Sequence, residues 1–136
     1  MKILIVGHGE YPTGTKSAIK LLTGVDEGID AINLHEDLTH DKFTEIVNAY
    51  VKENEKLIVF ADITGGAPFQ ITSREVLLNE ESNDQYVIGG VSVGCILDIV
   101  MKTIVISTDE DIRDTIESSL EGLKDMSTVI SRRDIA

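Results

Sequence analysis

The sequence is poor in cations and in cysteine, and each shortage excludes a class of protein. It has 12 Lys and Arg residues against 24 Asp and Glu residues, which gives a formal net charge of −12. This balance argues against nucleic acid as a partner, because phosphate backbones bind clusters of basic side chains. A large negative charge keeps a protein in solution and favours association with a partner whose surface is basic.

Cys95 is the only cysteine, so no disulfide can form within the chain. A lone cysteine in an apolar stretch is typical of a hydrophobic core. No apolar run approaches the roughly 20 residues that a membrane-spanning helix needs. The short apolar run near the start lacks the small-residue cleavage site of a secretory signal. We therefore expect a cytoplasmic protein.

Two nucleotide-binding motifs and the common metal-binding patterns are also missing. The sequence has neither GxxxxGK[ST] nor GxGxxG, which argues against a nucleotide-driven kinase and a Rossmann-type dehydrogenase. No cysteine–histidine cluster and no acidic triad predicts a metal site. We expect neither a cofactor nor a metal ion.

The residues that are present favour one α/β domain spanning 1–136. Hydrophobic residues make up 42% of the chain, enough for a proper core. Apolar runs alternate with segments of helical spacing, which is typical of a parallel sheet. The expected strands are 2–7, 29–34, 57–61 and 86–90. A turn with Pro12 and Gly14 is expected after the first strand. The expected helices are 15–22 before Gly24, a helix that follows an N-cap at Thr39 and includes 43–51, and a helix that starts at Pro68.

The pattern after residue 92 is harder to interpret. Residues 93–101 are apolar on several faces and fit a helix or a strand, and 103–106 are β-branched. Thr108 is a candidate N-cap for a last helix. The apolar positions of that helix are Ile112, Ile116, Leu120 and Leu123. Residues 127–131 have the character of a short terminal strand.

The topology brings two polar side chains to one edge of the expected sheet. Alternating units of this kind form right-handed crossovers, and we expect the strand order 2-1-3-4 with helices on both faces. The crevice between the carboxyl ends of the first and third strands is then the point where ligands bind. His8 follows the first strand and Asp62 follows the third, so they flank this crevice from opposite sides.

These two residues, with the turn after Asp62, fit phosphoryl transfer to a histidine. A carboxylate that accepts one ring N–H fixes the tautomer and leaves the other ring nitrogen free as a nucleophile. The turn Thr64-Gly65-Gly66-Ala67 leads into a helix, and the amides at a helix N-terminus bind phosphate. Taken singly, each residue also fits a simple loop or turn. It is the combination at matching strand ends that favours phosphoryl transfer.

Two motifs resemble the IIA component of the mannose-family sugar phosphotransferase system of bacteria. They are IVGHG at 5–9 and FADITGGAPF at 60–69, which contains the unusual order D-x-x-G-G-x-P-F. The segment VIGGV at 87–91 matches the fourth strand of that family and the turn after it. The resemblance runs from residue 1 to about residue 125 and implies a single IIA-type phosphocarrier domain.

The resemblance implies a specific pathway. Members of the family accept a phosphoryl group from the phosphocarrier protein HPr, hold it on a histidine that matches His8, and pass it to a IIB protein during sugar uptake. Asp62 matches the aspartate that orients this histidine, and the amides around Gly65, Gly66 and Ala67 match the phosphate-binding turn. The family is typically a homodimer that exchanges its C-terminal strand. Contact with the membrane is then only indirect, through the transporter components.

Two departures and three alternatives stay open. Ala67 stands where the family often has a serine or threonine, and Pro12 stands where alanine is usual. The phosphotransfer subunit of dihydroxyacetone kinase has a similar domain. A receiver domain would carry its phosphoryl group on Asp62, but it needs an acidic pair after the first strand, where this chain has Gly-His-Gly. A flavodoxin-like binding module is the third alternative.

Overall fold

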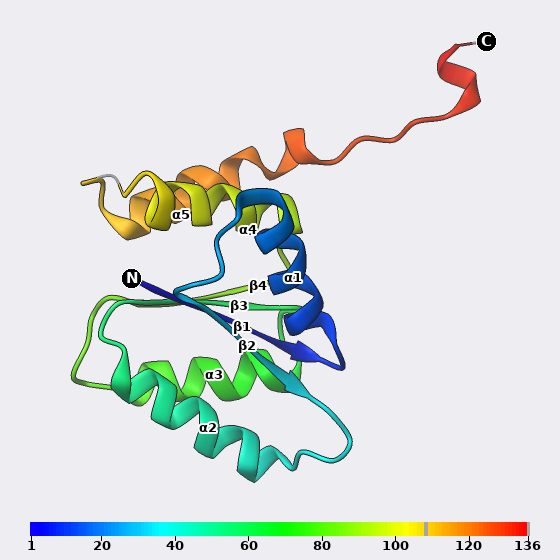
Figure 1. Ribbon diagram of the computed structural model, residues 1–136. Coiled ribbons are helices and arrows are strands. Elements are labelled where there is room, and N and C mark those ends of the chain that lie inside the picture. Colours follow the sequence, from blue (N-terminus) through cyan, green and yellow to red (C-terminus); the bar gives the residue numbers. More distant parts are fainter. Residues whose placement is uncertain (108, 136) are drawn as a thin grey trace.

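The computed structural model describes residues 1–107 and 109–135, which form a four-stranded parallel sheet with helices on both faces (Figure 1). The order β2-β1-β3-β4 confirms the prediction. Each neighbouring pair of strands is parallel. The strands are β1 Lys2–His8, β2 Ile29–Leu34, β3 Leu57–Ala61 and β4 Gln85–Gly89.

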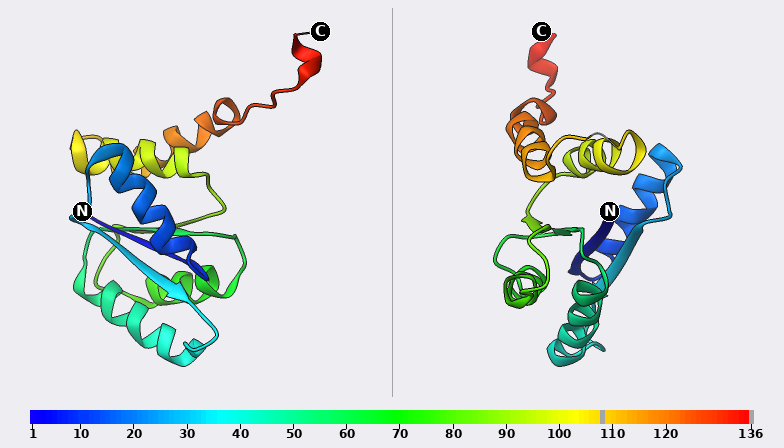
Figure 2. Two further views of the ribbon diagram at one scale, coloured as in Figure 1. Left: turned by 45° about the vertical axis from the view of Figure 1, so that its right-hand side comes forward. Right: turned by 90° about the vertical axis from the view of Figure 1, so that its left-hand side faces the viewer.

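The helices lie in two layers on the sheet. They are α1 Tyr11–Thr23, α2 His40–Glu53, α3 Ala67–Leu78, α4 Val93–Val100 and α5 Ile112–Glu121. Figures 1 and 2 show α2 and α3 on one face and α1 and α4 on the other, with α5 packed against α4. Across the described residues, no helix has both the length and the apolar character needed to cross a membrane.

The central strands are apolar throughout because each face of the sheet covers a separate core. In β1, Ile3 and Ile5 belong to the core that α4 helps to form, whereas Leu4 and Val6 face the other core. None of these four side chains has any exposed surface. The same is true of Phe43 of α2, which lies in the second core. This alternation produces the continuous apolar run expected of a strand buried on both faces.

The register of the sheet sets the position of the polar edge. Val6 pairs with Ala61 between β1 and β3, and His8 pairs with Leu34 between β1 and β2. The amide of Asp62 donates to the Val6 carbonyl at 3.3 Å, which continues the β1–β3 contact by one residue. The carboxyl ends of β1 and β3 therefore place His8 and Asp62 side by side.

Helix α1 begins at Tyr11, earlier than the predicted start at residue 15. The prediction treated Pro12 and Gly14 as a turn. However, proline fits the first turn of a helix because its missing N–H would have no partner there. The helix ends as expected at Gly24, which adopts a left-handed φ of 76° and donates its N–H to the Lys20 carbonyl.

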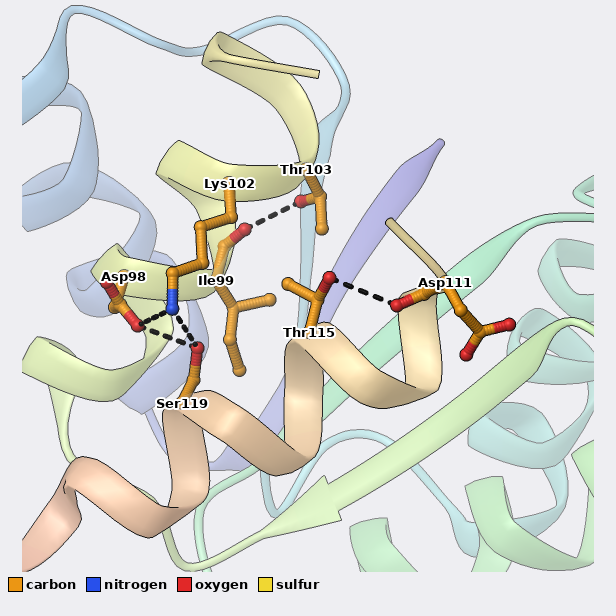
Figure 3. Close-up of polar contacts among 7 residues, drawn as sticks. All are labelled: Asp98, Ile99, Lys102, Thr103, Asp111, Thr115 and Ser119. Carbon is orange, nitrogen blue, oxygen red and sulfur yellow. Dashed lines mark hydrogen bonds and ion pairs between the residues drawn. The ribbon is translucent and has the colours of Figure 1, made fainter. Parts of the chain in front are cut away.

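The ambiguous segment 93–101 is helical, and 103–106 is not a strand. Helix α4 continues into a π-helical turn at Met101–Val105. The Thr103 hydroxyl donates to the Ile99 carbonyl at 2.7 Å (Figure 3), a local bond that keeps this β-branched stretch in a helical path. The β-branched composition alone could not reveal that contact.

A polar contact joins the end of α4 to α5 (Figure 3). The Lys102 ammonium lies 2.9 Å from Asp98 Oδ2, and the Ser119 hydroxyl donates to the same oxygen at 2.6 Å. The hydrogen bond from Ser119 lowers the pKa of Asp98; partial burial opposes this effect, and Lys102 reinforces it. The three side chains fix the position of α5 against α4.

The last helix is confirmed, with a different cap. Thr108, its predicted N-cap, lies outside the described residues. Helix α5 begins at Ile112, and the N-cap is Asp111, whose carboxylate accepts from the Asp114 amide at 3.2 Å. Aspartate is among the strongest N-cap residues, so this cap conforms to the same rule that suggested threonine.

Residues 127–131 do not form a strand within this chain, so that prediction was wrong for a single chain. The backbone is extended at both ends of the segment, but Val129 and Ile130 are 91% and 88% exposed. Figure 1 shows the segment leading away from the body of the protein toward a short turn at Arg132–Asp134. An extended segment becomes a strand only when a free strand edge lies beside it.

The buried hydroxyl of Thr72 in α3 yields a prediction about stability. Thr72 has no exposed surface, and its Oγ1 has no hydrogen-bond partner in the described part of the chain. Valine has nearly the same shape without the unsatisfied polar atom. We expect Thr72→Val to stabilise the protein by about 1 kcal/mol, seen as a higher urea midpoint at an unchanged m-value.

Thr115 provides the matched control for this prediction. It is 2% exposed, but its hydroxyl donates to the Asp111 carbonyl at 3.1 Å. Thr115→Val therefore removes a bonded hydroxyl and should bring no comparable gain. Equal effects of the two substitutions would contradict the explanation.

Candidate functional site

The side chains of His8 and Asp62 meet at the carboxyl edge of the sheet. His8 Nδ1 lies 2.8 Å from Asp62 Oδ2, and the His8 main-chain N–H donates to the same oxygen at 2.9 Å. The other carboxylate oxygen accepts from the Ile63 amide at 2.9 Å. A carboxylate at Nδ1 favours the tautomer with its proton there, so the lone pair of Nε2 is available for chemistry.

The two side chains differ in exposure. The His8 side chain is 47% exposed, whereas that of Asp62 is only 12% exposed. A macromolecule can therefore reach the imidazole while the carboxylate stays shielded behind it. Both oxygens of Asp62 already accept hydrogen bonds, which suits an orienting role and not that of an acceptor of a phosphoryl group.

Hydrogen bonds keep Asp62 ionised. Partial burial penalises the charged carboxylate and is the largest single influence on its pKa. The hydrogen bonds from the main chain and ring of His8, together with that from the Ile63 amide, outweigh burial and hold the pKa below its ordinary value. The carboxylate is thus charged at neutral pH and can balance positive charge on the imidazole.

Close contact between the two strand ends depends on Gly7. A Cβ at this position would lie 2.8 Å from a ring carbon of Tyr11 and 3.0 Å from the carboxyl carbon of Asp62. Side chains do not tolerate such contacts without moving. Tyr11, the first residue of α1, therefore packs across the backbone of Gly7 on one side while Asp62 approaches from the other.

The turn after Asp62 approaches the imidazole at Gly66. A Cβ on Gly66 would lie 3.0 Å from His8 Cε1 and 3.8 Å from Nε2. Ala67 follows as the first residue of α3, so the amide end of that helix lies beside the free ring nitrogen. Gly65 has a left-handed φ of 88°, which suits glycine.

Thr64 is placed differently from the other residues of the predicted cradle. A Cβ on Gly89 would lie 2.6 Å from Thr64 Oγ1, and one on Gly90 would lie 3.4 Å from it. The Thr64 hydroxyl thus lies against the end of β4. The structure brings Gly66 close to His8, with Ala67 next along the chain, but it turns the Thr64 side chain toward β4.

Three residues at this edge were missed by the sequence reasoning. Tyr11 lies before the helix that was predicted from residue 15, Ile63 is 54% exposed beside the site, and Asn33 bonds to the first turn of α1. A polar residue near the carboxyl end of a predicted strand was a signal that could have identified Asn33. In the described ranges, no group of three or more His, Cys, Asp or Glu side chains could hold a metal ion.

Comparisons with known proteins define the class to which this fold and site belong. The sequence model of the EIIA-man family, described as the PTS system fructose IIA component, matches residues 2–116. The chain therefore belongs to this family of phosphotransferase-system IIA components. No curated protein matches the sequence significantly.

Solved structures of similar fold agree with this class. Component EIIA of the phosphotransferase system from Streptococcus agalactiae is 24% identical, with a TM-score of 0.77 and coverage of 99% of this chain and 98% of that one. The mannose/sorbose-specific IIA subunit from Enterococcus faecalis is 15% identical, with a TM-score of 0.77 and coverage of 96% and 94%. A IIA protein associated with a fucose utilization operon in Streptococcus pneumoniae is 15% identical, with a TM-score of 0.73 and coverage of 93% and 96%.

The packing around Gly7 yields a second prediction. Gly7→Ala places a methyl group between Tyr11 and Asp62, so we expect a loss of about 1–3 kcal/mol in the free energy of unfolding from overpacking. Gly14→Ala is the matched control, because a Cβ there meets nothing within 4 Å and the position is helical. The free energy of unfolding of Gly14→Ala should rise by about 0.5–1 kcal/mol. Urea denaturation measures both, and a neutral Gly7→Ala would refute the close contact.

Proposed function

We propose that this chain is a phosphohistidine carrier that accepts a phosphoryl group from HPr on His8 Nε2 and passes it to a IIB protein during sugar uptake. The observation that carries the proposal is the 2.8 Å contact between His8 Nδ1 and Asp62 Oδ2 beside the amide end of α3. Membership of the IIA family supports the general role of a phosphoryl carrier.

The proposed transfer exchanges one phosphorus–nitrogen bond for another. The lone pair of His8 Nε2 attacks the phosphorus of phosphorylated HPr, and the bond from phosphorus to the HPr histidine breaks, returning its electron pair to that ring. The Nδ1 proton stays on His8, where Asp62 Oδ2 accepts its hydrogen bond and balances the charge. The reverse sequence delivers the group to IIB.

The turn before α3 supports this chemistry through its main chain. The first amides of a helix lack intrahelical partners and carry partial positive charge. Within 64–67 we assign the phosphate contact to the amides of Gly65, Gly66 and Ala67, with Thr64 shaping the turn against β4. Ala67 has no hydroxyl to add to this contact, so the backbone donors hold the phosphoryl group.

The exposure and charge of the protein suit protein partners. The donor and acceptor histidines lie on other proteins, and a side chain that is 47% exposed can meet them. A net charge of −12 favours basic docking surfaces on those partners. We place the carrier in the cytoplasm, in contact with the membrane only through the transporter components.

Phosphoryl labelling tests the role of His8. Incubation with phosphoenolpyruvate, enzyme I and HPr should add one phosphoryl group to the wild-type chain, measured by intact mass spectrometry, and none to His8→Ala. His40→Ala is the control, because His40 is exposed at the start of α2 and should leave labelling unchanged. If the His8→Ala variant still gained a phosphoryl group, His8 would not be the phosphorylated residue.

The same assay tests the role of Asp62. Asp62→Asn keeps the shape but replaces a charged acceptor with an amide that can favour the wrong tautomer, so transfer should slow by about 10²-fold or more. Transfer at the wild-type rate would exclude Asp62 as the orienting group. Delivery of the label to a IIB protein, and not to a dihydroxyacetone kinase, separates the sugar pathway from its closest alternative.

We also propose that the carrier is a homodimer in which 127–131 of one chain pair with β4 of the other. Strand β4 is at the edge of the sheet and pairs with β3 on one side only. A cavity of about 640 Å³ lies beside it, lined in part by Phe69, Val76 and Leu120. The exposed apolar residues Val129 and Ile130 have the chemistry to cover this edge.

Sedimentation equilibrium tests this dimer. The intact chain should sediment as a dimer, and Val129→Asp with Ile130→Asp should sediment as a monomer, because charge would be buried against an apolar groove. Ile135→Asp is the control; Ile135 is 84% exposed but lies outside the pairing segment. A monomeric wild type, or a double variant that stays dimeric, would contradict the exchange.

A further inference from the structure

A side chain of strand β2, that of Asn33, caps the N-terminal end of helix α1. Glu10 occupies the N-cap position but makes no side-chain capping bond, and Pro12 has no N–H to offer. The amide of Thr13, in the first turn, still needs an acceptor. It donates to Oδ1 of Asn33, near the carboxyl end of β2, at 3.2 Å.

Asn33 makes a second bond that reaches the turn before α1. Its Nδ2 donates to Thr13 Oγ1 at 3.0 Å, and the Thr13 hydroxyl donates to the Glu10 carbonyl at 3.3 Å. Beside it, the Gly9 amide donates to the carbonyl of Leu34 at 2.9 Å. The last two residues of β2 therefore hold the Gly9–Glu10 turn through a short chain of hydrogen bonds.

Gly9 and Glu10 themselves make little packing contact. Gly9 adopts a left-handed φ of 58°, and a Cβ on it would meet nothing within 4 Å. Glu10 is exposed, as is Thr13. Tyr11 and the buried Pro12 anchor the start of α1 by packing, whereas the exposed Gly9–Glu10 turn before it is tied to β2 by the bonds from Asn33 and Leu34.

The position of the turn matters because His8 immediately precedes it. The main-chain N–H and the ring Nδ1 of His8 bind the same oxygen of Asp62, so a shift of the His8 backbone also moves the ring. Asp62 fixes the end of β1 from the β3 side. Asn33 fixes the residues that follow from the β2 side.

We propose that Asn33 is a positioning residue for phosphoryl transfer: by capping α1 from β2, its amide holds the turn after His8 so that Nε2 meets the incoming phosphorus in line. The inference rests on the proposed function and deepens it. Asn33 acts through the Thr13–Glu10 backbone and need not touch the partner protein. It should therefore govern the rate of transfer and not the affinity for HPr.

Transfer kinetics at a temperature well below unfolding test the inference. Asn33→Ala should lower kcat for transfer from phosphorylated HPr by about tenfold, with KM for HPr unchanged, since a small misplacement of a reacting group slows the chemical step. Asn33→Asp keeps an acceptor for the Thr13 amide and should recover most of the rate. Thr13→Val loses only the hydroxyl, so its kcat should lie between those of Asn33→Ala and Asn33→Asp. Thr13→Ser keeps the hydroxyl and should have the kcat of the wild type.

A matched control separates positioning from general stability. Asn48 of α2 donates to Glu75 Oε2 of α3 at 2.8 Å, so Asn48→Ala also breaks a bond between two elements, but on the face of the sheet opposite α1. It should lower the melting temperature and leave kcat unchanged. A kcat for Asn33→Ala equal to that of wild type, or a rise in KM alone, would overturn the inference.

The remaining outcomes are also decisive. If Asn33→Ala does not fold, Thr13→Val carries the test, because it breaks the link from Asn33 through the Thr13 hydroxyl to the Glu10 carbonyl; wild-type kcat in that variant would overturn the inference. If the wild-type chain is not labelled by HPr, the proposed function fails and the inference fails with it. If the wild type is labelled and Asn33→Ala transfers equally fast, only the inference fails.

Discussion

One oxygen of Asp62 joins the ends of the two central strands and determines the chemistry at this edge. It accepts from both the main chain and the ring of His8, so the strand and the imidazole are held by the same atom. Because β1 and β3 are parallel neighbours, both residues emerge at one edge of the sheet. The orientation of the imidazole is thus a consequence of sheet register and does not need a flexible loop to close.

Glycines allow this edge to be assembled so closely. Gly7 admits Asp62 and Tyr11 to the backbone of β1, Gly66 admits the start of α3 to the imidazole, and Gly89 leaves room for Thr64. A side chain at any of these positions would meet a neighbour at 3.0 Å or less. These three glycines, two from the sequence motifs and one from the segment 87–91, therefore allow close approach between segments.

The sequence predicted what depends on local patterns and missed what depends on contacts between distant segments. The strands, their order and the meeting of His8 with Asp62 follow from apolar runs and the geometry of parallel sheets. The early start of α1 was missed because Pro12 and Gly14 were interpreted as a turn, and because the acceptor for its Thr13 amide, Asn33, lies on the distant strand β2. Residues 127–131 have the composition of a strand, but a strand also needs a partner, which composition cannot supply.

The proposed carrier has to release the phosphoryl group as readily as it accepts it. If the site stabilised the phosphorylated state strongly, the activation free energy for transfer to the next protein would rise. The site has one orienting carboxylate and the amide end of α3, while Ala67 contributes no hydroxyl. These few groups would bind the phosphoryl group only weakly. Asp62 on one side of His8 and, in our proposal, Asn33 on the other fix the position of the imidazole, so the site can orient the ring and still release the phosphoryl group.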